Sequence, residues 1–153
     1  MSISIELQNT LSESGLPTLE DFQCWAQAIP SQEQQEVLIR IVDGQEILAL
    51  NKRFRQQNKA TNVLSFPAEL PEVVECPLLG DVIICAQVVQ QEASQQGKSV
   101  ISHWAHLTVH GILHLMGYNH IANSDAQIME SLEIDIMQTL GFVNPYSDIH
   151  SPN

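Results

Sequence analysis

Three histidines, His110, His114 and His120, have the residue type and the spacing of a metal site. Two histidines four residues apart on a helix project from the same face, so their imidazoles can converge on one ion. Gly117 permits a left-handed turn at the helix end, which would bring His120 back toward the same point. Three neutral histidine nitrogens leave a fourth tetrahedral position for water, as in catalytic zinc sites. The spacing therefore predicts a hydrolase that binds one metal ion.

Other histidines leave some alternatives open. His103 and His106 fall near the same helical stripe, and His106 and His110 are also four residues apart. No glycine turn lies upstream to bring in a third ligand, so we expect His103 and His106 to form hydrogen bonds or a polar helix face. His150, near the C-terminus, receives no role. Three imidazoles suit zinc, but nickel, copper and iron accept the same ligands.

The spacing His-x-x-x-His-x-x-Gly-x-x-His is that of the metzincin proteases. Those enzymes carry a catalytic glutamate directly after the first histidine, whereas this chain has Gly111. Without that carboxylate the expected general base is missing. A metallohydrolase of another substrate, such as a peptidase, therefore remains as a weaker alternative.

The formal net charge of −12 argues against general binding of nucleic acid, because phosphate contacts need a basic surface. The distribution of the cations weakens this objection. Four of the six lysines and arginines fall within eight positions: Lys52, Arg53, Arg55 and Lys59. An acidic protein with one cationic spot would repel polyanions elsewhere and accept a phosphate there. A solvated helix end is the competing interpretation of this cluster.

Hydrophobic periodicity predicts strands alternating with helices, which indicates an α/β or α+β layer fold. We expect residues 1–143 to form a single domain and residues 144–153 a flexible tail. Side chains of Thr18, Asp43 and Ser124 are expected to cap helices. The expected strands are 2–8, 37–42, 62–66 and 80–85, and the expected helices are 18–29, 87–96, 100–116 and 124–140. A further helix is expected to start at Asp43, to carry Ile47, Leu50, Asn51 and Phe54 on one side and to have the basic cluster at its end.

The sequence favours a cytoplasmic protein. Its N-terminus lacks the basic and apolar regions of a secretory signal, and no apolar run approaches the roughly 20 residues that cross a bilayer. Cys24, Cys76 and Cys85 are odd in number and widely spaced, which suits reduced thiols. The stretch from Pro67 to Pro77 carries three glutamates and is expected to be an exposed loop.

Three segments in order resemble the YbeY family of endoribonucleases and rRNA maturation factors. They are HGILHLMGYNH at residues 110–120, NKRFR at 51–55 continuing to TNVLSFP at 61–67, and LGDVII at 79–84. Together they extend from about residue 51 to residue 120, which makes the resemblance far more specific than the three histidines alone. The family usually has aspartate where this chain has Asn119, and an amide cannot act as a base.

The resemblance implies a single domain with a small mixed sheet of about four strands, packed by about five helices. It also implies a zinc ion bound by His110, His114 and His120, and an important arginine at Arg55. The implied activity is metal-dependent cleavage of single-stranded RNA, in 3′-end maturation of small-subunit (16S) rRNA and in ribosome quality control. The implied partners are rRNA and the small ribosomal subunit with its proteins, with no DNA and no membrane.

Roles for the polar residues follow as expectations. Arg55 is fixed in charge and can grip a phosphate with two donors. Arg53 and Lys59 are weaker candidates for backbone contacts, and Ser65 is expected to form a strand-end hydrogen bond or to offer its hydroxyl. No side chain stands out as the base, so either water or the RNA 2′-OH could attack. A ribosome assembly module with a structural zinc remains an alternative, which the acidic charge favours.

Overall fold

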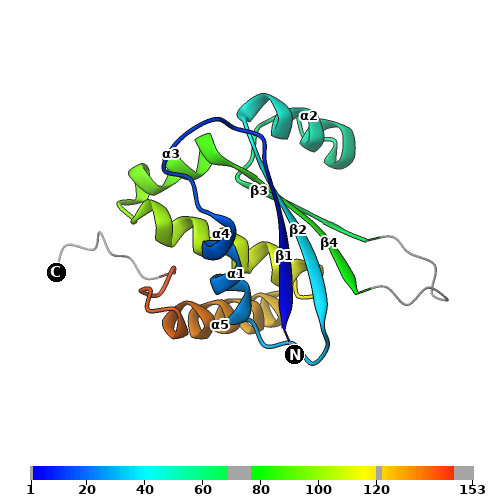
Figure 1. Cartoon of the computed structure of the whole chain (residues 1–153), viewed down its shortest axis with the longest axis vertical. Coiled ribbons are helices and arrows are strands. Elements are labelled where there is room, and N and C mark those ends of the chain that lie inside the picture. Colours follow the sequence, from blue (N-terminus) through cyan, green and yellow to red (C-terminus); the bar gives the residue numbers. More distant parts are fainter. Residues whose placement is uncertain (1, 69–76, 120–121, 147–153) are drawn as a thin grey trace.

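The computed structural model describes residues 2–68, 77–119 and 122–146. In this part of the chain four strands form one mixed sheet, accompanied by five helices (Figure 1). The predicted fold class is therefore confirmed. In chain order the elements are β1 (Ile3–Asn9), α1 (Leu19–Gln27), β2 (Gln35–Val42), α2 (Gly44–Arg55), β3 (Val63–Pro67), β4 (Leu78–Cys85), α3 (Ala86–Gln96), α4 (Val100–Leu115) and α5 (Asn123–Thr139).

The sheet has the strand order β1-β2-β4-β3, with β1, β2 and β4 parallel and β3 antiparallel to β4. β4 lies between two strands and is buried on both faces along its second half, as a continuous apolar run predicts. The register places Ser65 of β3 opposite Val82 of β4. This pair lies where α4 crosses the sheet, because α4 packs against both strands.

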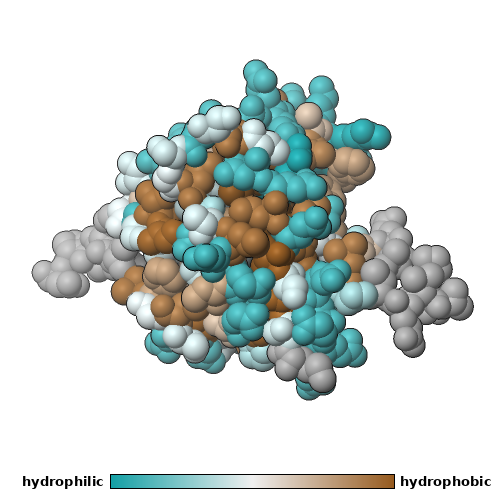
Figure 2. Space-filling view, viewed as in Figure 1, coloured by the Kyte–Doolittle hydropathy of each residue, from teal (hydrophilic) through white to brown (hydrophobic). Residues whose placement is uncertain are grey.

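Successive residues of β4 point to opposite faces and so serve two cores. Val82 and Ile84 belong to the main core, which α1, α4 and α5 help to enclose. Ile83 and Cys85 belong to a smaller core on the other face, which includes Ile47 of α2. Helix α2 therefore covers one face of the sheet while α1 and α4 cover the other. Figure 2 shows hydrophilic side chains gathered at the top of the view, over α2.

Two of the three predicted helix caps are present, and one prediction was wrong. Thr18 and Asp21 form a reciprocal capping box, and the Asp43 side chain accepts a hydrogen bond from the Glu46 N–H. Ser124 does not cap α5. That helix begins one residue earlier, at Asn123, with Ala122 as the N-cap, whose carbonyl accepts from the Ala126 N–H. Ser124 therefore lies inside the first turn.

Residues after α5 return to the body of the protein. The Lys98 ammonium donates to the Pro145 carbonyl at 2.8 Å, and the Tyr146 hydroxyl donates to Glu133 at 2.8 Å. The segment predicted as a flexible tail thus begins with residues that contact the fold, and residues 147–153, including His150, lie outside the described part. Residues 69–76 of the predicted acidic loop, which include Cys76, also lie outside the described part. Cys24 and Cys85 are free thiols.

None of the helices in the described ranges has both the length and the apolar character needed to span a bilayer.

Candidate active site

Helix α4 presents a pair of histidines to the edge of the sheet. His110 and His114 are half-buried, and their Nε2 atoms lie 3.1 Å apart. Two nitrogens that each bind one zinc ion at about 2.0–2.1 Å in tetrahedral geometry lie about 3.3 Å apart. The predicted convergence of this pair on one point is therefore present, and the donor set fits a divalent ion of the zinc type.

The end of α4 has the geometry that the glycine predicted. Gly117 has a φ of 103°. Its N–H bonds the His114 carbonyl, and the Tyr118 N–H bonds the Leu113 carbonyl, both at 3.1 Å. This is the pattern of a Schellman cap, which reverses the chain direction after a helix. The expected third ligand, His120, lies outside the described residues, so its position relative to the pair stays a prediction.

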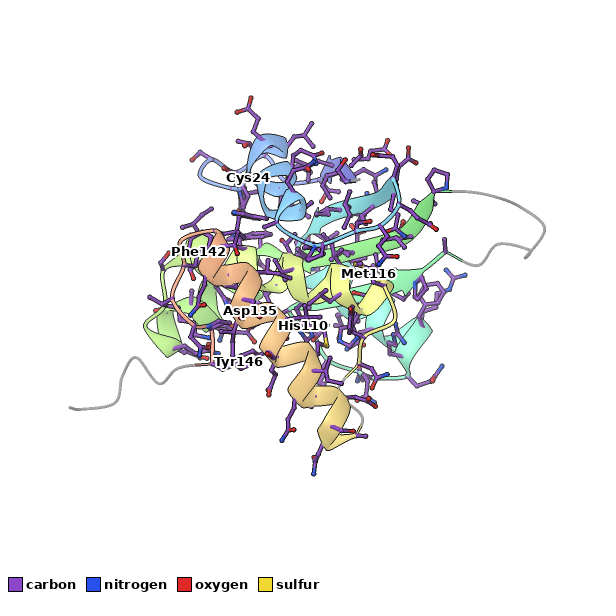
Figure 3. The ribbon with its side chains drawn as sticks, turned by 90° about the horizontal axis from the view of Figure 1, so that it is seen from below. Cys24, His110, Met116, Asp135, Phe142 and Tyr146 are labelled. Carbon is purple, nitrogen blue, oxygen red and sulfur yellow. The ribbon has the colours of Figure 1, made fainter. Side chains whose placement is uncertain are left out.

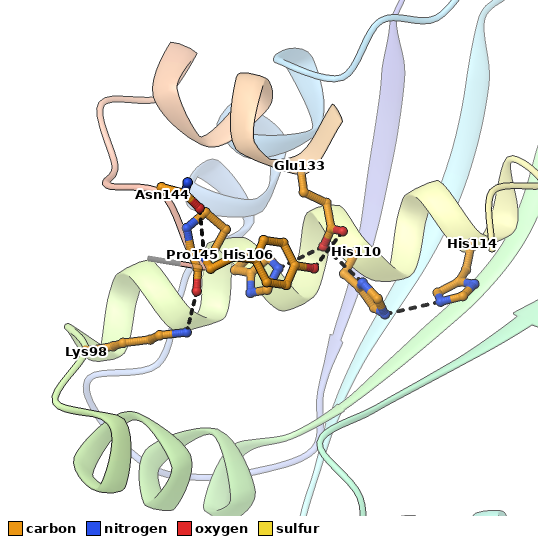
Figure 4. A network of polar contacts seen from close by, with 8 residues as sticks. Lys98, His106, His110, His114, Glu133, Asn144 and Pro145 are labelled. Carbon is orange, nitrogen blue, oxygen red and sulfur yellow. Dashed lines mark hydrogen bonds and ion pairs between the residues drawn. The ribbon is translucent and has the colours of Figure 1, made fainter. Parts of the chain in front are cut away.

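A buried carboxylate that the sequence analysis overlooked organises the pair from behind. Glu133 of α5 is fully buried. Its Oε1 accepts from His106 Nε2 at 2.8 Å and from His110 Nδ1 at 3.0 Å, while Oε2 accepts from the Tyr146 hydroxyl (Figure 4). Seen from below, α5 lies across α4 close to His110 (Figure 3). The crossing of the two helices thus brings this carboxylate to the histidines.

The electrostatics of this network fix its protonation. Burial raises the pKa of Glu133, but the hydrogen bonds from His106 and His110 outweigh it and lower that pKa to about 2. Burial and the neighbouring Glu133 raise the pKa of Tyr146 well above its ordinary range, so the phenol stays protonated and donates. With a proton on Nδ1 for Glu133, the His110 ring presents the lone pair of Nε2 toward His114.

His106, His110 and Glu133 form a second group whose ligand atoms lie within 4.8 Å of one another and could hold a metal ion. In the structure these atoms already bond one another, because both histidines donate to the same carboxylate oxygen. His103 likewise bonds Glu92 at 2.9 Å. His103 and His106 therefore form hydrogen bonds, as expected.

The two histidines of the pair share a cleft with the basic end of α2. The cleft has a volume of about 430 Å³. One Nη2–H of Arg55 donates to the Ser65 carbonyl at 2.6 Å, and the Ser65 hydroxyl donates to the Gly111 carbonyl at 3.0 Å. This chain of contacts joins α2, β3 and α4. The cleft is lined by Arg55, Asn62, Val63, Leu64, Ser65, Pro67, His110 and His114.

Gly111 allows α4 to approach the sheet closely. A Cβ atom at this position would lie 2.7 Å from Val82 Cγ1 and 3.3 Å from Ser65 Oγ. A glutamate here, as in the metzincin proteases, would require Val82 or α4 to shift. The absence of a side chain at this position therefore fits the close packing of α4 on the sheet.

Comparison with known proteins agrees with this geometry. Residues 8–141 match the family described as Endoribonuclease YbeY. The chain belongs to the YbeY family. The match includes every residue that lines the cleft, from Arg55 of α2 to His114 of α4, and confirms the resemblance that the three sequence segments carried.

The fold of this YbeY-family chain is also that of a solved structure. The solution structure of TM1509 from Thermotoga maritima aligns with a TM-score of 0.54 and 23% identity, covering 95% of this chain and 99% of that one. At this identity the likeness shows the fold alone.

The sequence analysis gave no role to two residues of this network, Glu133 and Tyr146. The position of Glu133 in its helix could have indicated a role. Glu133 falls in the apolar stripe of α5, four residues after Met129 and three before Ile136, both of which are buried. A carboxylate at such a position must find donors in the core. Tyr146 lies in a segment with no periodic pattern, and nothing local indicated its partner.

Proposed function

We propose that this protein is a zinc-dependent endoribonuclease that cuts single-stranded RNA in the cleft of Arg55, His110 and His114. The supporting observation is that cleft itself, where a permanent cation and two converging imidazoles meet in a chain with a net charge of −12. The family is described by an endoribonuclease activity, which agrees with this chemistry. The expected partner is therefore a flexible polyanion that can enter at one basic spot.

The ligands in this proposal are His110, His114 and His120. A divalent ion held there would supply a water of lowered pKa or polarise a phosphoryl oxygen. Glu133 orients the His110 ring and increases the basicity of its Nε2 by accepting from Nδ1. His106 and Tyr146 bond Glu133 and keep it in place, so three side chains behind the cleft determine the direction of one ligand, His110.

Arg55 positions the scissile phosphate. Its guanidinium has five N–H donors, and one Nη2–H is used by the Ser65 carbonyl, which fixes the side chain at the rim of the cleft. The remaining donors can hold two phosphate oxygens and stabilise the negative charge that develops on them. The Ser65 hydroxyl is engaged with the Gly111 carbonyl, so its role is to hold β3 against α4.

The attacking group is either water or the neighbouring 2′-OH, and the products distinguish them. Attack by the 2′-OH leaves a 2′,3′-cyclic phosphate, whereas attack by water leaves a terminal monophosphate. Asn119 cannot accept a proton as a carboxylate does, so it is not assigned as the base. Mass spectrometry of the cleaved oligonucleotide would identify the ends.

In the cell we propose 3′-end maturation of small-subunit (16S) rRNA and ribosome quality control, in the cytoplasm and in association with the small subunit. The acidic surface suits docking on basic ribosomal proteins. Co-sedimentation with small subunits, and sequencing of rRNA 3′ ends in cells that lack the protein, would test this part.

The test of the activity is cleavage of a labelled single-stranded RNA, with and without chelator. Arg55→Glu should abolish cleavage and keep metal content and folding intact, whereas Lys52→Glu, with the same charge change on the same exposed helix end, should cleave normally. His114→Ala, prepared in parallel, reveals contaminating ribonuclease. Normal cleavage by Arg55→Glu would contradict the assignment, cleavage of casein would favour a peptidase, and small-subunit binding without cleavage would favour an assembly module.

Elemental analysis of protein purified without an affinity tag locates the ion. His114→Ala should lose it, and His106→Gln should keep at least part of it. The opposite result would place the ion in the group of His106, His110 and Glu133.

A further inference from the structure

The basic end of α2 also carries an exposed aromatic side chain. Phe54 lies between Arg53 and Arg55 in sequence and is 51% exposed. Four of the six lysines and arginines of the chain fall at or just beyond this helix end, and all are exposed: Lys52, Arg53, Arg55 and Lys59. In Figure 2 this region is among the most hydrophilic of the visible face. This helix end thus combines an exposed phenyl ring with a cluster of cations.

Rings and guanidinium groups alternate on this surface. Phe54 and Phe66 meet edge to face, with centroids 5.4 Å apart. The Arg53 Cζ lies 5.1 Å from the Phe54 centroid, and the Arg55 Cζ lies 5.3 Å from the Phe66 centroid. Proteins that bind single-stranded nucleic acid without sequence preference combine these two elements, because cations attract the backbone and aromatic rings stack with the bases.

The two rings border a groove that adjoins the cleft. The groove has a volume of about 560 Å³ and shares Arg55 and Pro67 with the cleft. On its other side Arg40 is held by Glu46 through two hydrogen bonds of 2.6 and 3.2 Å, and Asp81 adds a carboxylate. A phosphate is therefore attracted to the Arg55 end, and the aromatic part of the groove suits an uncharged base.

Core packing explains one ring but not the other. Phe66 is half-buried and packs with Leu50 and Val88 against the smaller core. Phe54 is not part of either core, and about half of its surface is exposed to solvent. Its ring meets Phe66 edge to face and lies beside the Arg53 guanidinium.

We propose that Phe54 and Phe66 form a base-stacking subsite for a nucleotide of single-stranded RNA next to the phosphate held by Arg55. This inference rests on the proposed ribonuclease function and adds to it a second contact outside the cleft. The subsite favours unpaired RNA, because a base within a duplex is already stacked on both faces. It also explains how an acidic protein can hold a polyanion with few cations.

The test is a double-mutant cycle between Phe54 and the base. Phe54→Leu keeps an apolar side chain and removes the aromatic face, and an RNA series has one nucleotide at a time made abasic. Binding is measured by fluorescence anisotropy on chelator-treated protein, so that the RNA stays intact. With wild-type protein, the abasic change at one position should weaken binding about 10-fold. With Phe54→Leu, intact RNA should bind about 10-fold more weakly, and the same abasic change should have little further effect. Leu19→Ala, which alters an apolar side chain of similar exposure on α1, is the control and should bind as wild type.

The outcomes separate this inference from the proposed function. Wild-type protein that binds and cleaves RNA, together with a Phe54→Leu variant that binds as tightly, would overturn the subsite and leave the nuclease intact. Additive effects of the variant and the abasic change would also overturn it. Wild-type protein that neither binds nor cleaves RNA would refute the proposed function and this inference with it. An oligoglutamate peptide that displaces RNA from wild-type protein but not from Phe54→Leu would instead identify a protein-docking surface. That result would contradict the proposal.

Discussion

Glu133→Gln should destabilise the metal-free protein by about 3 kcal/mol at neutral pH. The carboxylate is fully buried and accepts from His106, His110 and Tyr146. Its pKa is lowered from 4.5 to about 2. Since each pKa unit corresponds to about 1.4 kcal/mol, the folded state favours the ionised form by about 3 kcal/mol. Glutamine has nearly the same shape but carries no charge, and its amide group would face N–H donors.

The pH dependence makes this prediction specific. Because the folded-state pKa lies below the ordinary value, the stabilisation is complete above about pH 4.5 and is lost as the pH falls toward 2. At pH 3 about 1 kcal/mol of it should remain, so the difference between Glu133→Gln and wild type should shrink by about 2 kcal/mol between pH 7 and pH 3. Urea unfolding in the presence of chelator, at both pH values, measures both differences.

A constant difference at both pH values would refute the reasoning, because the loss would then come from packing alone. So would a variant as stable as wild type at pH 7. The same variant should bind zinc about 10- to 100-fold more weakly, since the carboxylate behind a ligating histidine sets its orientation. Titration with a competing chelator gives that number independently of stability.

Three further predictions concern the two glycines that position α4 and its buried histidine His103. Gly111→Ala should lower the free energy of unfolding by about 1–2 kcal/mol, because overpacking against Val82 exceeds the gain in helix propensity. The double variant with Val82→Ala should lose less stability than the sum of the two single losses. Strict additivity in urea unfolding would contradict this. Gly117→Ala meets no atom within 4 Å but holds a φ of 103°, so a loss of about 1–2 kcal/mol is expected from backbone strain alone, and a neutral result would exclude it. Burial, partly opposed by the hydrogen bond to Glu92, lowers the pKa of His103 below 6.5. Its NMR titration midpoint should therefore fall below 6.5, and its contribution to stability should be lost as the pH drops below that value; a higher midpoint would reverse the sign.

Local sequence patterns were sufficient to predict most helices and strands and, within the site, the placement of His110 and His114 on one helix face. The stripe of apolar residues and histidines predicted α4 to within one residue at its C-terminal end. Gly117 predicted the helix cap, because few other residues adopt a positive φ. The four-residue spacing of His110 and His114 guaranteed that both imidazoles share a face whatever the rest of the chain does.

Contacts between distant segments could not be predicted in this way. Glu133 meets His110 across 23 positions of sequence. That contact depends on how α5 crosses α4, which periodicity does not specify. Tyr146 joins the same carboxylate from a segment without any pattern. Ser124 shows the opposite failure, since a suitable capping residue was present but the helix had already begun at Asn123.

Gly111 lies between the two ends of the site. It is also the position where the metzincin proteases carry their catalytic glutamate. Its missing side chain lets α4 lie against Val82, and its carbonyl receives the Ser65 hydroxyl. The Ser65 carbonyl in turn holds Arg55. A larger residue at position 111 would require Val82 or α4 to shift, and a shift of α4 would move His110 away from the strand that holds Arg55. The glycine that stands where the metzincin proteases have their base thus also helps His110, His114 and Arg55 to line one cleft.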